Sequence, residues 1–196
     1  MMIKKVGIYN LVLVCVILIC LFLISFQNAS ILSGKATAVF ATSNVSVSKY
    51  LSISFSSNLS EGILFGNVAV LPAVNVNASH NYDGSGNGTT LYISVSEDGN
   101  TPVDFCIKAD GDMMSLASDA LGLANETYSN STSTDAALPA LGSDASLTTS
   151  YVKSGNNVDL GETNYYRFWL DIPAAQPSGD YNNTVSFKGI QTGVNC

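Results

Sequence analysis

The sequence has few basic residues, a single histidine and little charge of either sign. Eight Lys and Arg residues among 196 exclude the basic surface that binding to nucleic acid requires. The low content of charged residues (12%) excludes a coiled coil, and the 16 glycines show no collagen-like period. Because His80 is the only histidine, the sequence also excludes a His-rich metal site.

Motifs that mark enzymes are also missing. The sequence has no HExxH zinc motif and no glycine-rich phosphate loop followed by lysine. His80 lies in a polar stretch that is typical of a solvated loop, so it does not indicate a catalytic triad. The segment 83–88 is similar to the front of a calcium loop, but position twelve is Ser94 where a bidentate Glu is needed. Asp110-Gly111-Asp112 indicates a turn, and we expect no enzyme activity, no metal and no cofactor.

The N-terminal region carries the one long apolar run. Lys4 and Lys5 precede a stretch from Val6 to Phe26 without charge, which is typical of a secretory signal. Small residues at Ala36-Thr37-Ala38 predict cleavage, with a mature start near Val39. Two alternatives are an uncleaved membrane anchor, because 21 residues just span a bilayer, and a prepilin leader cut after Gly7.

The first two interpretations place the remainder outside the cytoplasm, since the two lysines hold the start inside. We therefore predict a secreted protein at the cell surface, which contacts the membrane only through its leader before cleavage. Beyond Ala38, five basic and fifteen acidic residues give a net charge of −10. This charge makes nucleic acid and anionic lipid poor partners.

Cysteines and sequons are both consistent with export. Cys15 and Cys20 lie within the apolar run, which leaves Cys106 and Cys196 as the only pair in the exported part. An even pair in an exported chain predicts a disulfide. The sequence has eight Asn-x-Ser/Thr sequons, about double the chance number, which predict a glycoprotein. They lie at Asn28, Asn44, Asn58, Asn77, Asn87, Asn125, Asn130 and Asn182.

Beyond residue 38 the dominant hydrophobic period is two, which indicates strands with one buried face. Turn-forming clusters of Gly, Asn, Asp and Pro separate the apolar segments. The pattern predicts an all-β fold, an Ig-like or jelly-roll-like β-sandwich with a helical or loop insertion and an N-terminal hydrophobic leader. We expect strands at 50–56, 63–70, 90–96, 103–109, 147–153, 165–172 and 184–190.

The segment 112–146 departs from this alternation and is interpreted as the insertion. Within it we expect a short helix at 115–123 and a sugar-bearing surface loop at 125–135. On the strand at 165–172, one face is core. The other face carries Tyr165, Arg167, Trp169 and Asp171, and this face either stacks on sugars, packs on a neighbouring subunit or forms a partly covered outer surface.

Three features together resemble a known family. The segment 169–187, WLDIPAAQPSGDYNNTVSF, looks like the final hairpin of exported Ig-like and filament β-sandwiches. With the leader, the alternating Ser/Val segment after it and Leu51-Ser-Ile-Ser-Phe55, the chain resembles archaeal thread and bundling-pilus subunits. Those subunits are related to the TasA-type fibre proteins of bacterial biofilm matrices. The resemblance implies that the N-terminal strand of each subunit completes the sandwich of the next.

The residues 39–55 form a run too long for one strand of a small domain. Lys49 interrupts its apolar face, so we predict an extension at 39–49 and a sandwich domain at 50–196, after a signal peptide or anchor at 1–38. The extension is interpreted as a donor strand that inserts into another copy, through Val39, Ala41, Val45 and Val47. The alternatives are pairing within its own sheet and, for the whole protein, a membrane-anchored adhesin or sugar-binding module.

Overall fold

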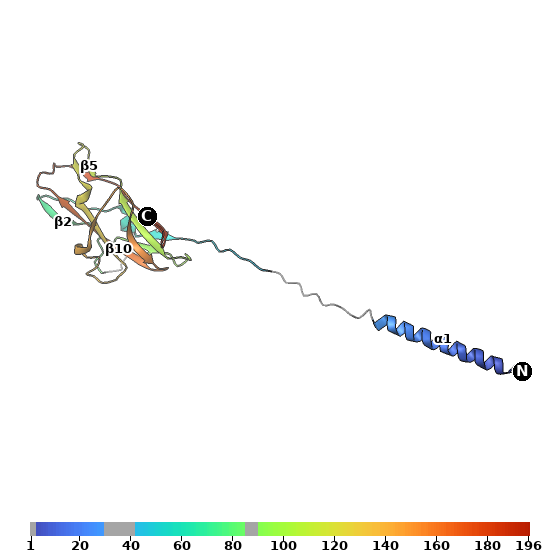
Figure 1. Ribbon diagram of the computed structural model, residues 1–196. Coiled ribbons are helices and arrows are strands. Elements are labelled where there is room, and N and C mark those ends of the chain that lie inside the picture. The colour runs from blue at the N-terminus through green and yellow to red at the C-terminus, as the bar shows by residue number, and fades with distance from the viewer. Residues whose placement is uncertain (1–2, 30–41, 85–89) are drawn as a thin grey trace. The chain divides into compact units, whose positions relative to one another are not determined.

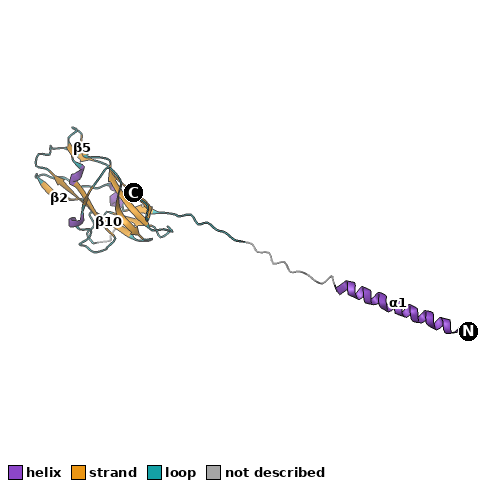
Figure 2. Cartoon of the chain, in the orientation of Figure 1, coloured by secondary structure: helices purple, strands orange, loops and turns teal. Residues whose placement is uncertain are grey.

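The computed structural model describes residues 3–29, 42–84 and 90–196 (Figure 1). The chain forms two compact units, Met1–Ser46 and Val47–Cys196. Strands hold 35% of the residues and helices 15%, and α1 accounts for most of the helix. The second unit is therefore built mainly from strands, as the orange arrows in Figure 2 show.

Helix α1 (Ile3–Ala29) is the principal element of the first unit. It coincides with the apolar stretch, and its side chains from Asn10 to Leu23 are exposed. Within the described residues, no helix is both long enough and apolar enough to cross a membrane. The predicted cleavage position at Ala36–Ala38 lies outside the described residues.

The second unit contains three antiparallel sheets. The largest has the order β1-β3-β10-β7-β8, and β2 also pairs with β10. Two three-stranded sheets have the orders β12-β4-β9 and β11-β5-β6. The strands of the largest sheet are β1 (Ile53–Phe55), β2 (Ala73–Asn77), β3 (Tyr92–Val95), β7 (Glu126–Ser131), β8 (Ala145–Ser146) and β10 (Thr163–Ile172). The others are β4 (Val103–Ala109), β5 (Met113–Ser115), β6 (Ala120–Leu121), β9 (Val152–Val158), β11 (Tyr181–Asn182) and β12 (Val185–Gln191).

Strand β10 organises the largest sheet. One edge pairs with β7, from Tyr165 opposite Ser131 to Leu170 opposite Glu126. The other edge pairs first with β3 and then, towards the end of the strand, with β2. With ten residues, β10 extends for about 30 Å at 3.3 Å per residue. Its start therefore lies beside β3, and its end lies far from that point.

The main core lies between the β10 sheet and the β12-β4-β9 sheet. Phe168 and Tyr166 of β10 both contact the ring of Phe187 on β12, at centroid distances of 6.5 and 5.4 Å. Phe105 of β4 is fully buried in the same cluster. A fully buried side chain of this size contributes about 1.5–3 kcal/mol, so these aromatic contacts hold the two sheets together.

Short helices connect the strands. Helix α2 (Ser57–Glu61) begins at Ser56, whose hydroxyl accepts a hydrogen bond from the backbone N–H of Leu59 at 3.2 Å. The same hydroxyl accepts from the Tyr92 N–H, so the cap also ties α2 to β3. The remaining helices are the 3₁₀ turns η1 (Leu123–Asn125) and η2 (Leu141–Ser143).

The period-two pattern located four of the seven predicted strands closely, namely those that coincide with β3, β4, β10 and β12. The predicted strand at 103–109 coincides with β4, and the predictions at 165–172 and 184–190 fall within two residues of β10 and β12. Leu91, Ile93 and Val95 are buried, as predicted for the segment 90–96. The strand predicted at 147–153 lies further along the chain, where β9 begins at Val152. Of the strand predicted at 50–56, only the three residues of β1 form.

Three predictions for local structure are wrong. Residues 63–70 belong to no strand, since none of them joins a ladder, and Gly66 at φ 69° interrupts the segment. The segment 115–123 forms the β5–β6 hairpin in place of a helix, with Ser118 at φ 69° in its turn. The expected surface loop at 125–135 contains β7. Tyr128 of β7 packs in the core, beside Phe168 of β10. The sequence analysis also missed β2.

Candidate docking groove

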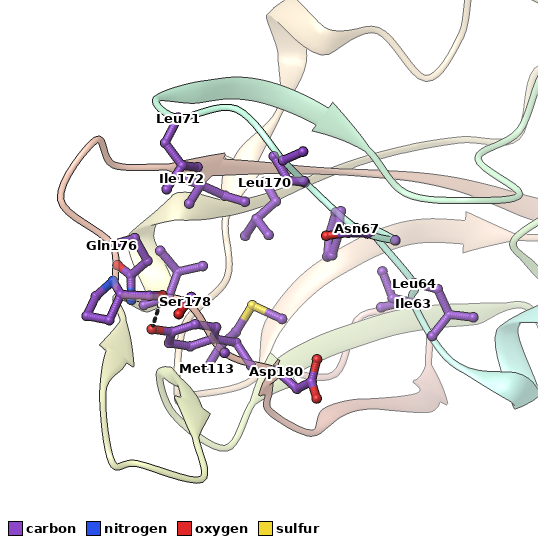
Figure 3. A pocket seen from close by; sticks show the side chains of 18 residues that line it. Ile63, Leu64, Asn67, Leu71, Met113, Leu170, Ile172, Gln176, Ser178 and Asp180 are labelled. Carbon is purple, nitrogen blue, oxygen red and sulfur yellow. Dashed lines mark hydrogen bonds between the residues drawn. The ribbon is translucent and has the colours of Figure 1, made fainter.

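A groove with a volume of about 750 Å³ opens on the second unit, beside the end of β10 (Figure 3). This volume falls in the range of about 300–1,000 Å³ that is common for binding sites. Three parts of the chain form its walls: the irregular segment 63–71, the β5–β6 hairpin and the loop that joins β10 to β11. The lining residues are Ile63, Leu64, Phe65, Gly66, Asn67, Val68, Ala69, Leu71, Met113, Leu121, Leu170, Ile172, Gln176, Pro177, Ser178, Gly179, Asp180 and Tyr181.

The first wall, residues 63–71, offers backbone groups that belong to no sheet. Within the described residues, this wall makes one backbone–backbone hydrogen bond, in which the N–H of Ser79 donates to the Leu64 carbonyl at 2.7 Å. Ile63 and Phe65 turn towards the core, whereas Leu64 is 53% exposed and Val70 is 77% exposed. Although the chain turns at Gly66 (φ 69°), a segment outside every sheet with exposed apolar side chains offers backbone groups to another strand.

The opposite wall is held in shape by two hydrogen bonds. The Tyr181 hydroxyl donates to the Pro177 carbonyl at 2.8 Å, which is the dashed line in Figure 3. The Gln176 side chain donates to the Ala120 carbonyl at 3.1 Å and so ties the loop to β6. The loop is therefore preformed, which lowers the entropic cost of binding a partner.

The base of the groove is a small apolar cluster separate from the main core. Met113, Leu121 and Leu170 are buried there, and Ile172 and Tyr181 pack against them. Of all the lining residues, Asp180 alone carries a charge at neutral pH. The groove is therefore suited to an apolar, uncharged ligand or peptide segment.

A buried carboxyl group lies near the β11 side of this region. Glu126 at the start of β7 is only 1% exposed, and its Oε2 accepts a hydrogen bond from the Asn183 side chain at 2.8 Å. Asn183 follows β11 and also donates to the Gly111 carbonyl. Burial raises the pKa of Glu126 above its ordinary value of 4.5, and the hydrogen bond from Asn183 only partly opposes that rise.

We predict that Glu126→Gln stabilises the protein at neutral pH. Because the pKa of Glu126 is raised in the folded state, its favourable contribution is complete below pH 4.5 and is lost as the pH rises through the folded value. Glutamine removes this loss and still accepts from Asn183. We expect a gain of about 1–3 kcal/mol at pH 7 in the free energy of unfolding, measured by denaturant titration. Glu97→Gln, at an exposed carboxyl, is the control and should change the free energy of unfolding little. If the stability of Glu126→Gln depended on pH as that of wild type does, the prediction would be contradicted.

The predicted donor segment is extended and exposed where it is described. Val45 and Val47 are 88% and 76% exposed, and residues 42–52 belong to no helix or strand. Val39 and Ala41 lie outside the described residues. The described part of the segment therefore presents large apolar side chains to solvent, an arrangement that favours association.

Asn100 holds the point where this segment meets the second unit. Its side-chain Oδ1 accepts from the Tyr50 N–H at 2.7 Å, and its Nδ2 donates to the Ser48 carbonyl at 2.9 Å. The Asn100 N–H also donates to the Tyr50 carbonyl. Residues after Ser48 are thereby anchored to the second unit.

The predicted disulfide is confirmed. Cys106 on β4 and Cys196 are bonded, with their Cα atoms 5.9 Å apart and a sequence separation of 90 residues. Cys106 is fully buried. The bond fastens the C-terminal tail across the β12-β4-β9 sheet.

The sequons differ in accessibility. Asn44, Asn77 and Asn182 are exposed, whereas Asn58 is half-buried and Asn87 lies outside the described residues. The half-buried Asn125 and Asn130 use their amide groups internally, on the Gly122 carbonyl and on Asn164 Oδ1. Asn28 falls within α1. The exposed sequons are thus the best placed for a glycan, and their modification stays a prediction.

The outer face of β10 is covered by its own loops. Arg167 donates to the carbonyls of Tyr82 and Ala136, and Trp169 is 4% exposed. Tyr165 stacks on Tyr82 at a centroid distance of 4.0 Å. These groups are thus engaged within the subunit, and Arg167 and Trp169 also line a second hollow of about 470 Å³ on this face.

Other residues weighed in the sequence have structural partners. Asp110 accepts from the Thr184 N–H at 2.8 Å, a bond that lowers its pKa, and Asp112 accepts from the Leu123 N–H. His80 is exposed at φ 65° in the turn before Tyr82. Most of the calcium-like segment lies outside the described residues. Among the described residues, no group of three or more His, Cys, Asp or Glu side chains is arranged to hold a metal ion.

The sequence analysis missed the groove. Its first wall was assigned to a strand, and the hairpin that forms another wall was assigned to a helix. The run of apolar residues at 63–71, together with a buried β5–β6 hairpin, was the only signal available. No protein-family model matches the chain, and a search of curated proteins gave no match.

Proposed function

We propose that the protein is an exported structural subunit that assembles into an extracellular filament by donor-strand insertion. In this proposal the segment 39–48 of one copy lies in the groove of the next copy. Copies of the chain are its partners, and it carries no catalytic activity. The observation that carries the proposal is the preformed, partly apolar groove, one wall of which is a backbone segment that belongs to no sheet.

The positions of the groove and of the donor segment support a head-to-tail arrangement. The first strand of the second unit is β1, where Ile53 pairs with Val95 of β3. The preceding β3 residue, Ser94, pairs with Thr163 at the start of β10. The groove is lined by Leu170 and Ile172 at the other end of β10. A donor at one end and an acceptor at the other make a heterologous contact, which propagates an open filament.

The chemistry of the two surfaces is also complementary. Residues 42–48 carry no charge and present Val45 and Val47 on one side of an extended chain. Burying one such valine contributes about 1.5–3 kcal/mol, and the backbone of residues 63–71 has free groups for pairing. Main-chain hydrogen bonds would then give affinity, and the alternate side chains would set the register.

The proposed architecture of the second unit is a β-sandwich. The rings of β10 and β12 that meet across the main core support facing sheets. The confirmed disulfide and the exposed sequons are compatible with an exported glycoprotein. The leader then directs export before its removal.

Deletion of residues 39–48 tests the proposal most directly. We expect soluble, folded subunits and no filaments by negative-stain microscopy. The double substitution Val45→Asp/Val47→Asp should weaken assembly by about a hundredfold, because two buried valines are replaced by charges. Thr42→Asp/Ser48→Asp adds the same charge on the opposite side of the segment and is the matched control. Normal polymerisation of the deleted protein would refute donor-strand assembly.

A further inference from the structure

We infer that Lys49 of one copy forms an ion pair with Asp180 of the next copy and sets the depth to which the donor segment enters the groove. This inference rests on the proposed function and adds a specific pair of positioning residues to it. Both residues are exposed, and neither has a partner of its own in the described part of the chain.

The other basic residues beyond Ala38 are all engaged. Lys153 donates to Asp104 at 2.6 Å, and Arg167 binds two backbone carbonyls. Lys108 and Lys188 lie over the Tyr151 ring, 4.9 and 4.3 Å from its centroid. Lys49 alone among these five contacts no acceptor and no aromatic ring in the described residues. In a protein with an excess of acidic groups, a free cation is available to a neighbouring copy.

Lys49 stands at the boundary between the donor segment and the second unit. Side chains of an extended chain alternate, so Val45, Val47 and Lys49 share one side. The next residue, Tyr50, is held by Asn100 of the same copy. When Val45 and Val47 occupy the groove of the next copy, Lys49 therefore lies at the groove's mouth and cannot enter further.

Asp180 is the charge that the groove offers at its margin. It precedes Tyr181 and lines the groove, where Figure 3 labels it. Other acidic residues of the second unit accept hydrogen bonds through their carboxylates, whereas the Asp180 carboxylate accepts none from the described residues. The engaged carboxylates accept hydrogen bonds from Thr184 (Asp110), Leu123 (Asp112), the Ser115 hydroxyl (Asp119) and Asn75 (Asp171).

A charge-swap experiment tests the pair. The chain is produced with its complete N-terminal region, and the critical concentration for filament formation is measured by sedimentation. We expect Lys49→Glu to raise it about tenfold, because an attraction becomes a repulsion, and Asp180→Lys to have a similar effect. The combination Lys49→Glu/Asp180→Lys should return to within about threefold of wild type.

The control for general charge effects is Lys49→Glu/Glu97→Lys, which restores the net charge at an exposed carboxyl of the β3–β4 connection. It should not rescue assembly. Equal rescue by Glu97→Lys, or no rescue by Asp180→Lys, would overturn the inferred pair. Those results leave donor-strand assembly intact as long as deletion of residues 39–48 still abolishes filaments, so the two failures are distinguishable.

Discussion

Removal of the Cys106–Cys196 disulfide is expected to lower the free energy of unfolding by about 4–5 kcal/mol. The bond closes a loop with a sequence separation of 90 residues, and the chain-entropy model gives a value of this size for so long a loop. The tail that it fastens also holds Gly193 against Asp104 and places the Cys196 carbonyl on Lys188 Nζ, at 2.7 Å. Loss of the bond therefore frees a segment on which two other contacts depend.

The variant for this test is Cys106→Ala/Cys196→Ala, studied by denaturant titration. Alanine is preferred at position 106 because the site is fully buried and a serine hydroxyl would have no assured partner there. Reduction of the wild-type protein serves as the control that changes no side-chain volume. A loss below about 1 kcal/mol in both experiments would contradict the prediction.

Asp104→Ala is expected to cost about 3–5 kcal/mol, because it removes the buried acceptor of several hydrogen bonds, each worth about 1–3 kcal/mol when its donor is left unpaired. The Asp104 carboxylate on β4 is fully buried and accepts hydrogen bonds from four donors. Its donors are Lys153 Nζ at 2.6 Å, the Asn157 N–H at 2.7 Å, the Gly193 N–H at 3.1 Å and the Thr192 hydroxyl at 3.2 Å. The substitution thus leaves donors of β9 and of the C-terminal tail without their acceptor.

The pH dependence separates this role from simple packing. Burial acts to raise the pKa of Asp104, but the bonds from Lys153, Asn157 and Gly193 outweigh it and lower the pKa below 3.8. A lowered folded pKa gives stability that is complete above the unfolded value and is lost as the pH falls through the folded one. Wild type should therefore lose stability below about pH 4, and Asp104→Asn should show a smaller loss there. Glu97→Ala removes an exposed carboxyl and is the control. If Asp104→Ala lost no more stability at neutral pH than Glu97→Ala, the role assigned to Asp104 would be contradicted.

The contrast between β4 and the segment 63–70 shows what local pattern can predict. Both are runs of apolar residues, yet only β4 forms a strand, because β12 and β9 lie on its two sides and take up its backbone groups. Residues 63–70 have no such neighbour. Hydrophobic pattern reports which side chains favour burial, whereas strand formation also requires a partner that is distant in sequence.

The segment 112–146 illustrates the same limit. Its mixture of Ala, Leu, Ser and Asp fits no strict period, so short-range propensity favoured a helix and a loop. In the structure Met113 and Leu121 are buried as a hairpin pair, and β7 pairs with β10 along its whole length. Tertiary contacts outweighed weak local preferences, as is common for short strands.

The sequence by itself determined the features that depend on composition and local order. These are the apolar N-terminal run, the strands β4, β10 and β12, the acidic charge and the pairing of Cys106 with Cys196, which followed from there being only two cysteines beyond the run. The tertiary structure alone decided where the groove lies, which carboxylates are buried and which charges are left free. Those properties arise from residues such as Leu64, Met113 and Asp180, which are far apart in the chain and meet only because the sheets bring them together.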